Sequence, residues 1–295
     1  MAPVVFKNPH LPDYFLPFPE VTADAPADAI PSVVQPFESG RVIVFPNLRL
    51  VIDHGFWASL PTDAYPDLKK LPSRPPERPG EPDEPLDNRL AKGGAPPELA
   101  RRLREEIGSV YAQALPLYER LFDGYRFTRR HAVWRLNTIM NENMHVDTYP
   151  QAFQEHFARM FINLDDQPRI WHTSWPIAEM YRRFAGRVGE EVAAGGDADL
   201  FRTHVNRRAF GAGSQEWWDS EPRHVVYFQP GDVWIVDSRQ VAHQIFYGRR
   251  AASIDFFVER ASMRRPGRHY LKLAERLRTE ALERSAAEPT SAEAQ

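Results

Sequence analysis

The stretch PGDVWIVDSRQVAHQIFYGRRAASIDFFVE, residues 230–259, contains three short apolar segments separated by turn-forming residues. Pro230-Gly231-Asp232 predicts one turn, and Gly248-Arg249-Arg250 predicts another. Short runs rich in valine, isoleucine and aromatic residues between such turns are typical of β-strands. The stretch therefore predicts consecutive strands, with His243 at the start of the middle one.

The chain has the same character from Tyr125 onward. One helix is expected to interrupt it, near residues 177–194. Many short strands with few helices favour a barrel or jelly roll, a mainly β fold with flanking helices. The expected strands are YRFTRRHAVWRL, FARMFINL, PRIWHT, HVVYFQ, VWIVDS, AHQIFY and ASIDFFVE.

Helices are expected on both sides of this β region. Apolar residues recur at three- and four-residue intervals in residues 98–122, the pattern of an amphipathic helix that Pro116 should kink. A second helix is predicted over residues 266–284. We therefore expect one catalytic domain over residues 1–285, with a β core at about 125–260, helical support at 97–122 and 266–284, and a disordered tail at 286–295.

Two segments before these elements are distinctive. GRVIVFPNLRLVI, residues 40–52, predicts a buried strand followed by a half-buried one, and the fold is expected to begin there. Residues 72–97 are rich in proline and are expected to form neither a helix nor a central strand. We interpret them as a surface loop, with an active-site lid as the alternative.

The composition excludes several classes of protein. The 295 residues include no cysteine, so disulfides, iron–sulfur clusters and thiolate zinc sites are absent, and any metal must bind nitrogen and oxygen ligands. A net charge of −3 and a pI near 6.4 argue against a nucleic-acid partner. Residues 1–20 do not show the cationic start and apolar stretch expected of a signal peptide, and no apolar run approaches the roughly 20 residues that cross a bilayer. A cytoplasmic protein is expected.

A histidine and an aspartate lie two residues apart in NENMHVDTYP, residues 141–150. With 10 histidines and 40 acidic residues in the chain, chance alone gives about 1.4 such pairs. Side chains at i and i+2 of a strand point to one face, so His145 and Asp147 can form a two-ligand arm for a metal. His243 is the first choice for a third ligand. The alternatives are His172, His204 and His224.

Two imidazoles and one carboxylate form the facial triad of non-haem iron oxygenases, which leaves three positions on Fe(II) for cosubstrate and O2. In members that use 2-oxoglutarate, an arginine on the strand after the distal histidine commonly pairs with the far carboxylate of the cosubstrate. Gly-x-Arg is common at this place, so Arg250 is the preferred candidate and Arg249 the alternate.

Other polar residues near these positions are candidates for ligand binding. Alternation along FARMFINL places Arg159 and Asn163 on one face, and Asn163 is a candidate contact for the cosubstrate. Arginines on neighbouring strands could bind an anionic group of a substrate, and a tyrosine beside the metal arm could line its pocket. These candidates for substrate contact are Arg135, Arg159, Arg169 and Tyr149.

At these motifs the sequence resembles the bacterial 3-deoxy-D-manno-oct-2-ulosonic acid (Kdo) hydroxylases, iron and 2-oxoglutarate dioxygenases that act on lipopolysaccharide precursor. The similar stretches, in order, are FESGRVIVFPNL, HVDTYP, RMFINLDDQPRIW and GDVWIVDSRQVAHQ. The resemblance covers roughly residues 35–260. It implies a double-stranded β-helix fold, the iron ligands His145, Asp147 and His243, and hydroxylation of an unactivated C–H bond, at C3 of a Kdo sugar on Kdo-lipid A.

Residues 72–97 and 185–222 match this family poorly, and substrate would be selected there, so a relative could keep the iron chemistry and change its target. One alternative is a 2-oxoglutarate-dependent tailoring hydroxylase of a free amino acid or natural product. The other is a cupin-like metal-binding protein without oxygenase activity. The carboxylate of Asp147 favours hydroxylation over halogenation, because related halogenases leave its position to halide.

A lipid-linked substrate would require an approach to the inner membrane. The C-terminal helix carries basic residues beside an apolar stripe, as peripheral membrane helices do, with packing of the stripe on the barrel as the alternative. The expected partner is a small-molecule or glycolipid substrate, and the sequence does not define the oligomeric state. The basic residues are Arg264, Arg265, Arg268, Lys272, Arg276 and Arg278.

Overall fold

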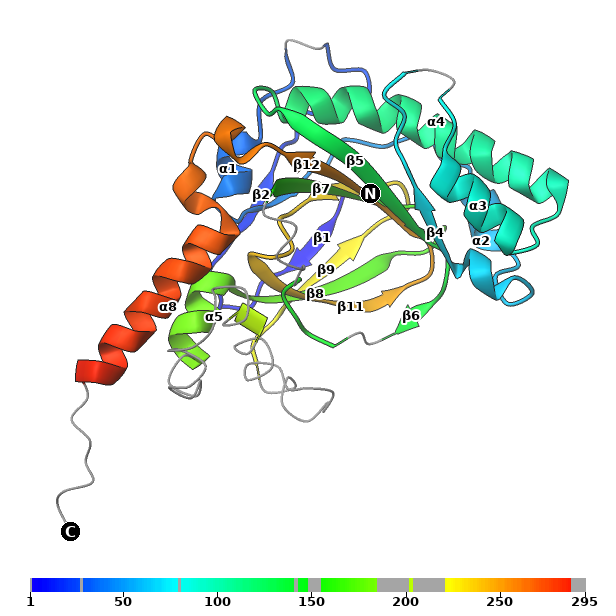
Figure 1. Cartoon of the computed structure of the whole chain (residues 1–295). Coiled ribbons are helices and arrows are strands. Elements are labelled where there is room, and N and C mark those ends of the chain that lie inside the picture. The colour runs from blue at the N-terminus through cyan, green and yellow to red at the C-terminus, as the bar shows by residue number, and fades with distance from the viewer. Residues whose placement is uncertain are drawn as a thin grey trace.

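Two β-sheets face each other in the computed structural model, which describes residues 2–26, 29–78, 81–140, 143–147, 155–184, 202–203 and 221–287 (Figure 1). One sheet has five strands in the order β1-β9-β8-β11-β6, and the other has seven in the order β2-β3-β10-β7-β12-β5-β4. The smaller sheet contains β1 (Val4–Phe6), β6 (Ile139–Met140), β8 (Arg169–Pro176), β9 (His224–Phe228) and β11 (Val241–Gly248). The larger contains β2 (Phe15–Pro17), β3 (Val42–Val44), β4 (Lys70–Ser73), β5 (Phe127–Arg135), β7 (His156–Asn163), β10 (Val233–Ile235) and β12 (Ala251–Val258).

All seven strands expected after Tyr125 are present, as β5 and β7 to β12. Their pairings are antiparallel, with β12 between β5 and β7, and β8 between β9 and β11. The prediction of a mainly β jelly roll with flanking helices is confirmed.

The beginning of the fold differs from the prediction. Only Val42–Val44 of residues 40–52 forms a strand, and two earlier strands, Val4–Phe6 and Phe15–Pro17, already belong to the sheets. Val5 pairs with Val226 of β9, and Phe15 pairs with Val42 of β3. Three-residue strands are too short to show an alternation in sequence, so only their partners reveal them.

The proline-rich segment is also more regular than predicted. Strand β4 extends into it as far as Ser73, and α3 (Glu84–Lys92) lies inside it. Pro85 occupies the first turn of α3, where a missing N–H costs no helical hydrogen bond, and the Asp83 side chain accepts from the backbone N–H of Leu86. The prolines therefore start a helix here instead of excluding one.

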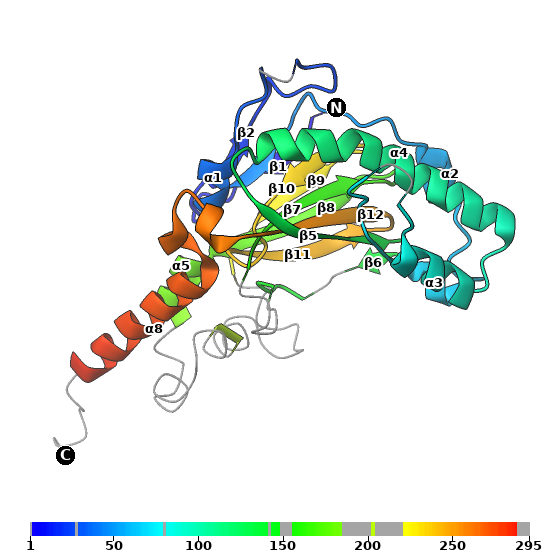
Figure 2. The same ribbon diagram turned by 45° about the horizontal axis from the view of Figure 1, so that its top comes forward.

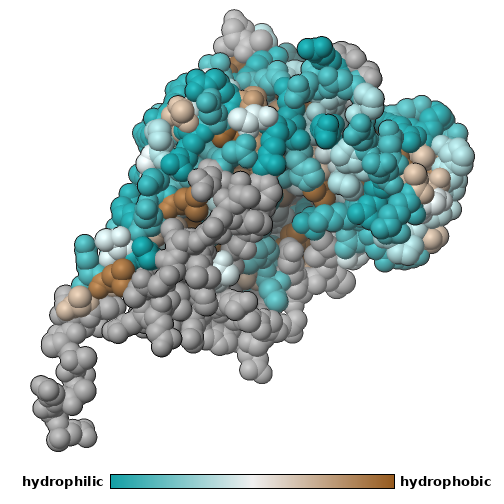
Figure 3. All heavy atoms as spheres, in the orientation of Figure 1, coloured by the Kyte–Doolittle hydropathy of each residue, from teal (hydrophilic) through white to brown (hydrophobic). Residues whose placement is uncertain are grey.

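Helix α4 (Pro97–Leu121) matches the predicted amphipathic helix and runs through Pro116. It lies along the outer face of the larger sheet in both ribbon views (Figures 1 and 2). Its buried face contacts the even-numbered side chains of β12, and Tyr118 stacks on Phe256 with 3.8 Å between ring centroids. The surfaces of α3 and α4 seen in Figure 3 are largely hydrophilic, so α4 turns its apolar face to the sheet and its polar face to solvent.

The remaining helices pack against each other beside the smaller sheet. Helix α5 (Ile177–Phe184) covers the first part of the predicted 177–194 helix, and residues 185–194 lie outside the described part of the chain. Helix α8 (Tyr270–Ala287) begins four residues later than predicted and includes two residues of the expected tail. Its apolar stripe, with Leu273 and Leu277, is buried against α5. Among the described residues, no helix combines the length and the apolarity needed to span a bilayer.

Arg250, the expected cosubstrate arginine, has a different environment from the one predicted. Its side chain is 6 % exposed, and it donates hydrogen bonds to the backbone carbonyls of Trp57, Leu60 and Leu136. Trp57 and Leu60 lie at the carboxyl end of α2 (His54–Ser59), and their carbonyls also accept from the backbone N–H groups of Leu60 and Thr62, so the guanidinium adds a charged donor to each.

Replacing Arg250 with leucine should therefore affect stability. We expect Arg250→Leu to lower the free energy of unfolding by about 3 kcal/mol, because three buried charge-assisted hydrogen bonds to backbone carbonyls are lost. Urea denaturation measures this loss. The control is Arg101→Leu on the exposed face of α4, whose surface ion pairs should contribute at most about 0.5 kcal/mol. Equal stability of the two variants would contradict the interpretation.

Candidate metal centre

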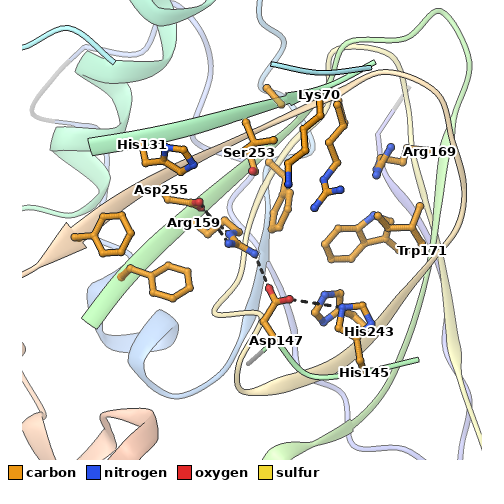
Figure 4. Close-up of a pocket in the computed structure, with 18 residues that line it drawn as sticks. Lys70, His131, His145, Asp147, Arg159, Arg169, Trp171, His243, Ser253 and Asp255 are labelled. Atoms are coloured by element: carbon orange, nitrogen blue, oxygen red, sulfur yellow. Dashed lines mark hydrogen bonds and ion pairs between the residues drawn. The ribbon is translucent and has the colours of Figure 1, made fainter. Parts of the chain in front are cut away.

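His145 and His243 are brought together by an isolated antiparallel β-bridge. The backbone N–H of each residue donates to the carbonyl of the other, with N···O distances of 3.0 and 2.8 Å. Two residues later, the N–H of Asp147 donates to the carbonyl of Ser238 at 2.9 Å. The segment 143–147 is thus fixed along the start of β11, with the side chains of His145 and Asp147 turned toward His243 (Figure 4).

The three side chains can converge on one ion. One ligand atom from each of His145, Asp147 and His243 lies within 4.8 Å of the others, and they are the one such group among the described residues (Figure 4). The Nδ1 atom of His145 lies 2.7 Å from the carbonyl oxygen of Asn143, and that of His243 lies 3.0 Å from the carbonyl of Val241. Because a carbonyl only accepts, each Nδ1 carries a proton and each Nε2 is left as a metal ligand.

A second ionic contact holds the carboxylate of Asp147. Its Oδ2 accepts from Arg159 Nη1 and from Ser238 Oγ, each at 2.5 Å, while its Oδ1 lies 3.6 Å from His145 Nε2. Arg159 also donates through Nε to Asp255 at 2.6 Å. One oxygen of Asp147 is therefore used within the protein, and the other faces the two imidazoles.

The environment keeps Asp147 and His243 in the protonation states that a metal requires. Burial would raise the pKa of Asp147, but Arg159 and the two histidines outweigh it and hold that pKa well below its usual range. Burial, and then the neighbouring His145, lower the pKa of His243 to about 4. At neutral pH the site thus offers a carboxylate and a neutral His243 imidazole.

The alternative third ligands do not reach this site. Both ring nitrogens of His224 are engaged, by the N–H of Asn8 and by the carbonyl of Pro12. His172 contacts the side chain of Gln244. His204 lies outside the described residues. Of the described candidates, only His243 contacts the pair.

A cavity of about 390 Å³ opens beside the three side chains, between the two sheets. Apart from Lys70 of β4, Ala252 of β12 and the metal-ligand segment, its walls come from the odd-numbered positions of β5, β7, β8, β11 and β12. Aromatic rings form much of the lining, and the charged groups among the lining residues are Lys70, Arg135, Asp147, Arg159, Arg169 and Asp255. Cations outnumber acids, so the cavity is suited to anionic ligands.

Three of the predicted arginines, Arg135, Arg159 and Arg169, line this cavity. The expected cosubstrate contacts do not. Arg249 pairs with Asp165 and Asp166, and Arg250 lies on the opposite face of the larger sheet. The side-chain amide of Asn163 donates to two backbone carbonyls and has a structural role. The predicted contact Tyr149 lies outside the described residues.

The sequence interpretation missed several lining residues. Side chains alternate between the two faces of a strand, so Ser253 and Asp255 could be assigned to the cavity once it is known that the odd-numbered side chains of β12 face it. The same argument assigns His131 of β5 to the cavity. Trp171 stacks on His243, with ring centroids 5.3 Å apart. Lys70 had no signal, because no strand was predicted between residues 52 and 72.

Arg169 is the most buried cation of the cavity, and close packing against Gly248 fixes its position. It is 3 % exposed and precedes Trp171 by two residues on β8, so the two side chains share a face. It lies against Gly248, where an added Cβ would approach Arg169 Cγ to 2.9 Å and the guanidinium more closely. The glycine of the Gly-x-Arg motif therefore makes room for an arginine of the neighbouring strand.

Comparison with known proteins identifies one family. The sequence model of the 3-deoxy-D-manno-oct-2-ulosonic acid (Kdo) hydroxylases matches residues 97–281, more than half of the chain. No curated protein matches in sequence.

Solved structures of one protein share the fold. The Kdo hydroxylase KdoO, a non-heme Fe(II) α-ketoglutarate-dependent dioxygenase in complex with α-ketoglutarate and Fe(III), has a TM-score of 0.59 and 18 % identity, over 93 % of this chain and 96 % of that one. Its cobalt(II) complex has a TM-score of 0.54 and 19 % identity, over 96 % and 99 %.

Removing the carboxylate of the candidate metal centre should abolish tight metal binding. We expect Asp147→Ala to weaken Co(II) or anaerobic Fe(II) binding by at least about 100-fold, because two histidines alone bind weakly. Calorimetric titration measures the affinity, and circular dichroism checks the fold. Asp123→Ala, at an exposed position after α4, is the control. Undiminished affinity in Asp147→Ala would exclude this site as the metal centre.

Proposed function

The chain belongs to the Kdo hydroxylase family, and on that premise we propose that it is an Fe(II)- and 2-oxoglutarate-dependent dioxygenase. 2-Oxoglutarate is the α-ketoglutarate of the KdoO complex. The proposed reaction is the hydroxylation of an unactivated C–H bond of a Kdo sugar, at C3. The observation that carries the proposal is the convergence of two imidazoles and one carboxylate beside a cavity rich in cations.

His145, Asp147 and His243 would hold the iron through two Nε2 atoms and one carboxylate oxygen, a donor set that suits Fe(II). When bound, iron and cosubstrate supply the oxidising chemistry that places one oxygen atom of O2 on the substrate. The chain itself fixes the donors. Arg159 and Ser238 occupy the second oxygen of Asp147, which favours a single metal–oxygen bond and leaves positions open for ligands.

We assign the far carboxylate of 2-oxoglutarate to Arg169 instead of Arg250 or Arg249. Arg169 is buried in the cavity wall next to Trp171, which itself stacks on His243. A dicarboxylate bound at the metal can extend along this wall, so that its far carboxylate accepts two hydrogen bonds from the planar guanidinium. Arg250 cannot contribute, since its donors are used by backbone carbonyls.

Aromatic side chains complete the environment. Phe157, Phe161, Trp171 and Phe257 line the cavity and reduce the volume that water can occupy. Exclusion of water strengthens ionic contacts to both anionic ligands and protects a reactive site from side reactions. The carboxylate of Asp147 also supports hydroxylation over halogenation, because halide has no vacant protein position to fill.

The context of the substrate is part of the proposal. We propose Kdo-lipid A as the substrate and the cytoplasmic face of the inner membrane as the place of action, with residues 1–285 acting as one catalytic domain. Pairing of β1 with β9 supports the single domain, since it joins the first strand of the chain to a strand of the β core. The stripe of α8 is buried against α5, so any membrane contact would be electrostatic and would not insert the helix.

A direct assay tests the reaction. Kdo-bearing lipid A precursor, incubated with the protein, Fe(II), 2-oxoglutarate and O2, should gain about 16 mass units with release of succinate, as the stoichiometry of hydroxylation requires. Mass spectrometry of the lipid measures the gain, and Asp147→Ala is the matched inactive control. Cosubstrate consumption only with amino acids or other soluble metabolites would favour the tailoring hydroxylase. Tight metal binding without any 2-oxoglutarate turnover would favour the cupin-like protein.

The assignment of Arg169 has its own test. Gly248→Ala adds a methyl group that collides with Arg169, so we expect the dissociation constant of 2-oxoglutarate to rise by about 10- to 100-fold while metal affinity is retained. Anaerobic titration of the iron-loaded protein, followed by the metal-to-ligand charge-transfer band, measures both. The control is Gly108→Ala in α4, where an added methyl meets no atom. An unchanged 2-oxoglutarate affinity in Gly248→Ala would argue against Arg169 as the anchor.

A further inference from the structure

Two cations face each other across the outer strand pair of the larger sheet. Lys70 of β4 and Arg135 of β5 are direct partners in the antiparallel register. Like charges at directly opposed positions destabilise a sheet. Their presence at this place therefore needs a reason other than the stability of the fold.

No acid compensates this pair in the described part of the chain. Neither side chain forms a hydrogen bond or an ion pair with another described residue. The two acids of the cavity, Asp147 and Asp255, are both held by Arg159. Partial burial, and then repulsion from Arg135 and Arg89, lower the pKa of Lys70. The direction of this shift agrees with a lysine whose charged neighbours are also cations.

Both side chains line the same cavity as the candidate metal centre. Figure 4 shows Lys70 reaching into the cavity from its upper edge, on the side away from His145, with Arg169 above Trp171 on another wall. Lys70 is exposed and Arg135 is partly buried, whereas Arg169 is enclosed. The cavity thus has a cationic pair at its edge, exposed at Lys70 and partly buried at Arg135, and one enclosed cation in its wall.

We propose that Lys70 and Arg135 form the subsite that binds the carboxylate of the sugar acid. The inference rests on the proposed function, in which two different anions must occupy one cavity. The dicarboxylate is small enough to be enclosed and fits Arg169. The sugar is attached to a bulky lipid that stays outside, so its acid group meets the cations at the exposed edge. Arg159 serves neither anion, because it is bound to Asp147 and Asp255.

The experiment compares the two anions in the same variants. In Lys70→Gln and Arg135→Gln we expect KM for the Kdo substrate to rise about 10- to 100-fold, with kcat changed little, since a charge-assisted contact to bound substrate is lost. The dissociation constant of 2-oxoglutarate, from the anaerobic titration, should stay within about twofold of the wild-type value. Lys69→Gln, at the neighbouring lysine that pairs with Asp63 on the surface, is the matched control and should change neither value.

A second arm removes the charge from the ligand. The methyl ester of the sugar acid should bind wild-type protein as weakly as the acid binds the glutamine variants, and these variants should show no further loss with the ester. Lys70→Arg, which keeps the charge, should recover part of the affinity. The stability of the protein without ligands gives a separate measure: Lys70→Gln should be at least as stable in urea as wild type, because a repulsion is removed.

The outcomes separate this inference from the proposed function. If wild-type protein oxidises the Kdo substrate but the variants keep its KM, the subsite is wrong and the function stands. If the variants lose 2-oxoglutarate affinity instead, the pair serves the cosubstrate, and the inference is overturned. If Lys70→Gln loses stability, the pair has a structural role. If the wild-type protein is inactive on every Kdo substrate, the proposed function itself is contradicted, and the inference about the subsite falls with it.

Discussion

Arg159 connects the metal-binding carboxylate to the centre of the larger sheet, and the geometry of the site depends on this contact. It lies on β7 directly opposite Asp255 of β12, and its guanidinium bridges Asp255 and Asp147. Burying one cation between two carboxylates is costly unless every group is paired, and here each carboxylate keeps a short contact to the same guanidinium. Asp147 is thereby ionised and oriented before any metal arrives. The backbone bridge between His145 and His243 completes the arrangement from the other sheet.

The three candidate metal ligands could be found in the sequence because their spacing reflects local geometry. An i, i+2 pair shares a face in any extended segment, so His145 and Asp147 needed no knowledge of the fold. The position of Arg250 could not be obtained in this way. Apart from Ala252, the cavity-lining residues of β12 are odd-numbered, and the even-numbered ones belong to the core cluster with α4, so position 250 points into the core. Alternation in a strand shows which residues share a face, but the motif Gly-x-Arg does not show which of the two faces lines the cavity.

Lys70 was missed because prolines dominate its neighbourhood. A strand with Pro72 can exist only where the missing N–H is not needed, and β4 is the edge strand of its sheet. Edge position depends on which strands pair, and this cannot be obtained from composition. The short strands at residues 4–6 and 15–17 were not predicted for a related reason, since they form only by pairing with strands that lie later in the chain. Local pattern thus predicted the long central strands, and long-range pairing produced the rest.

The chemical difference between lysine and arginine agrees with their places in the cavity. A guanidinium is more weakly hydrated than an ammonium and presents a planar fork, so it loses less when it is enclosed. Arg169, the enclosed cation, is an arginine, and so are the partly buried Arg135 and Arg159, whereas the exposed position carries Lys70. Desolvation also strengthens an ionic contact, so an enclosed arginine holds a small anion firmly, while an exposed lysine exchanges its partner with solvent more easily. A cavity built in this way can retain a cosubstrate while a larger acid binds and leaves at its edge.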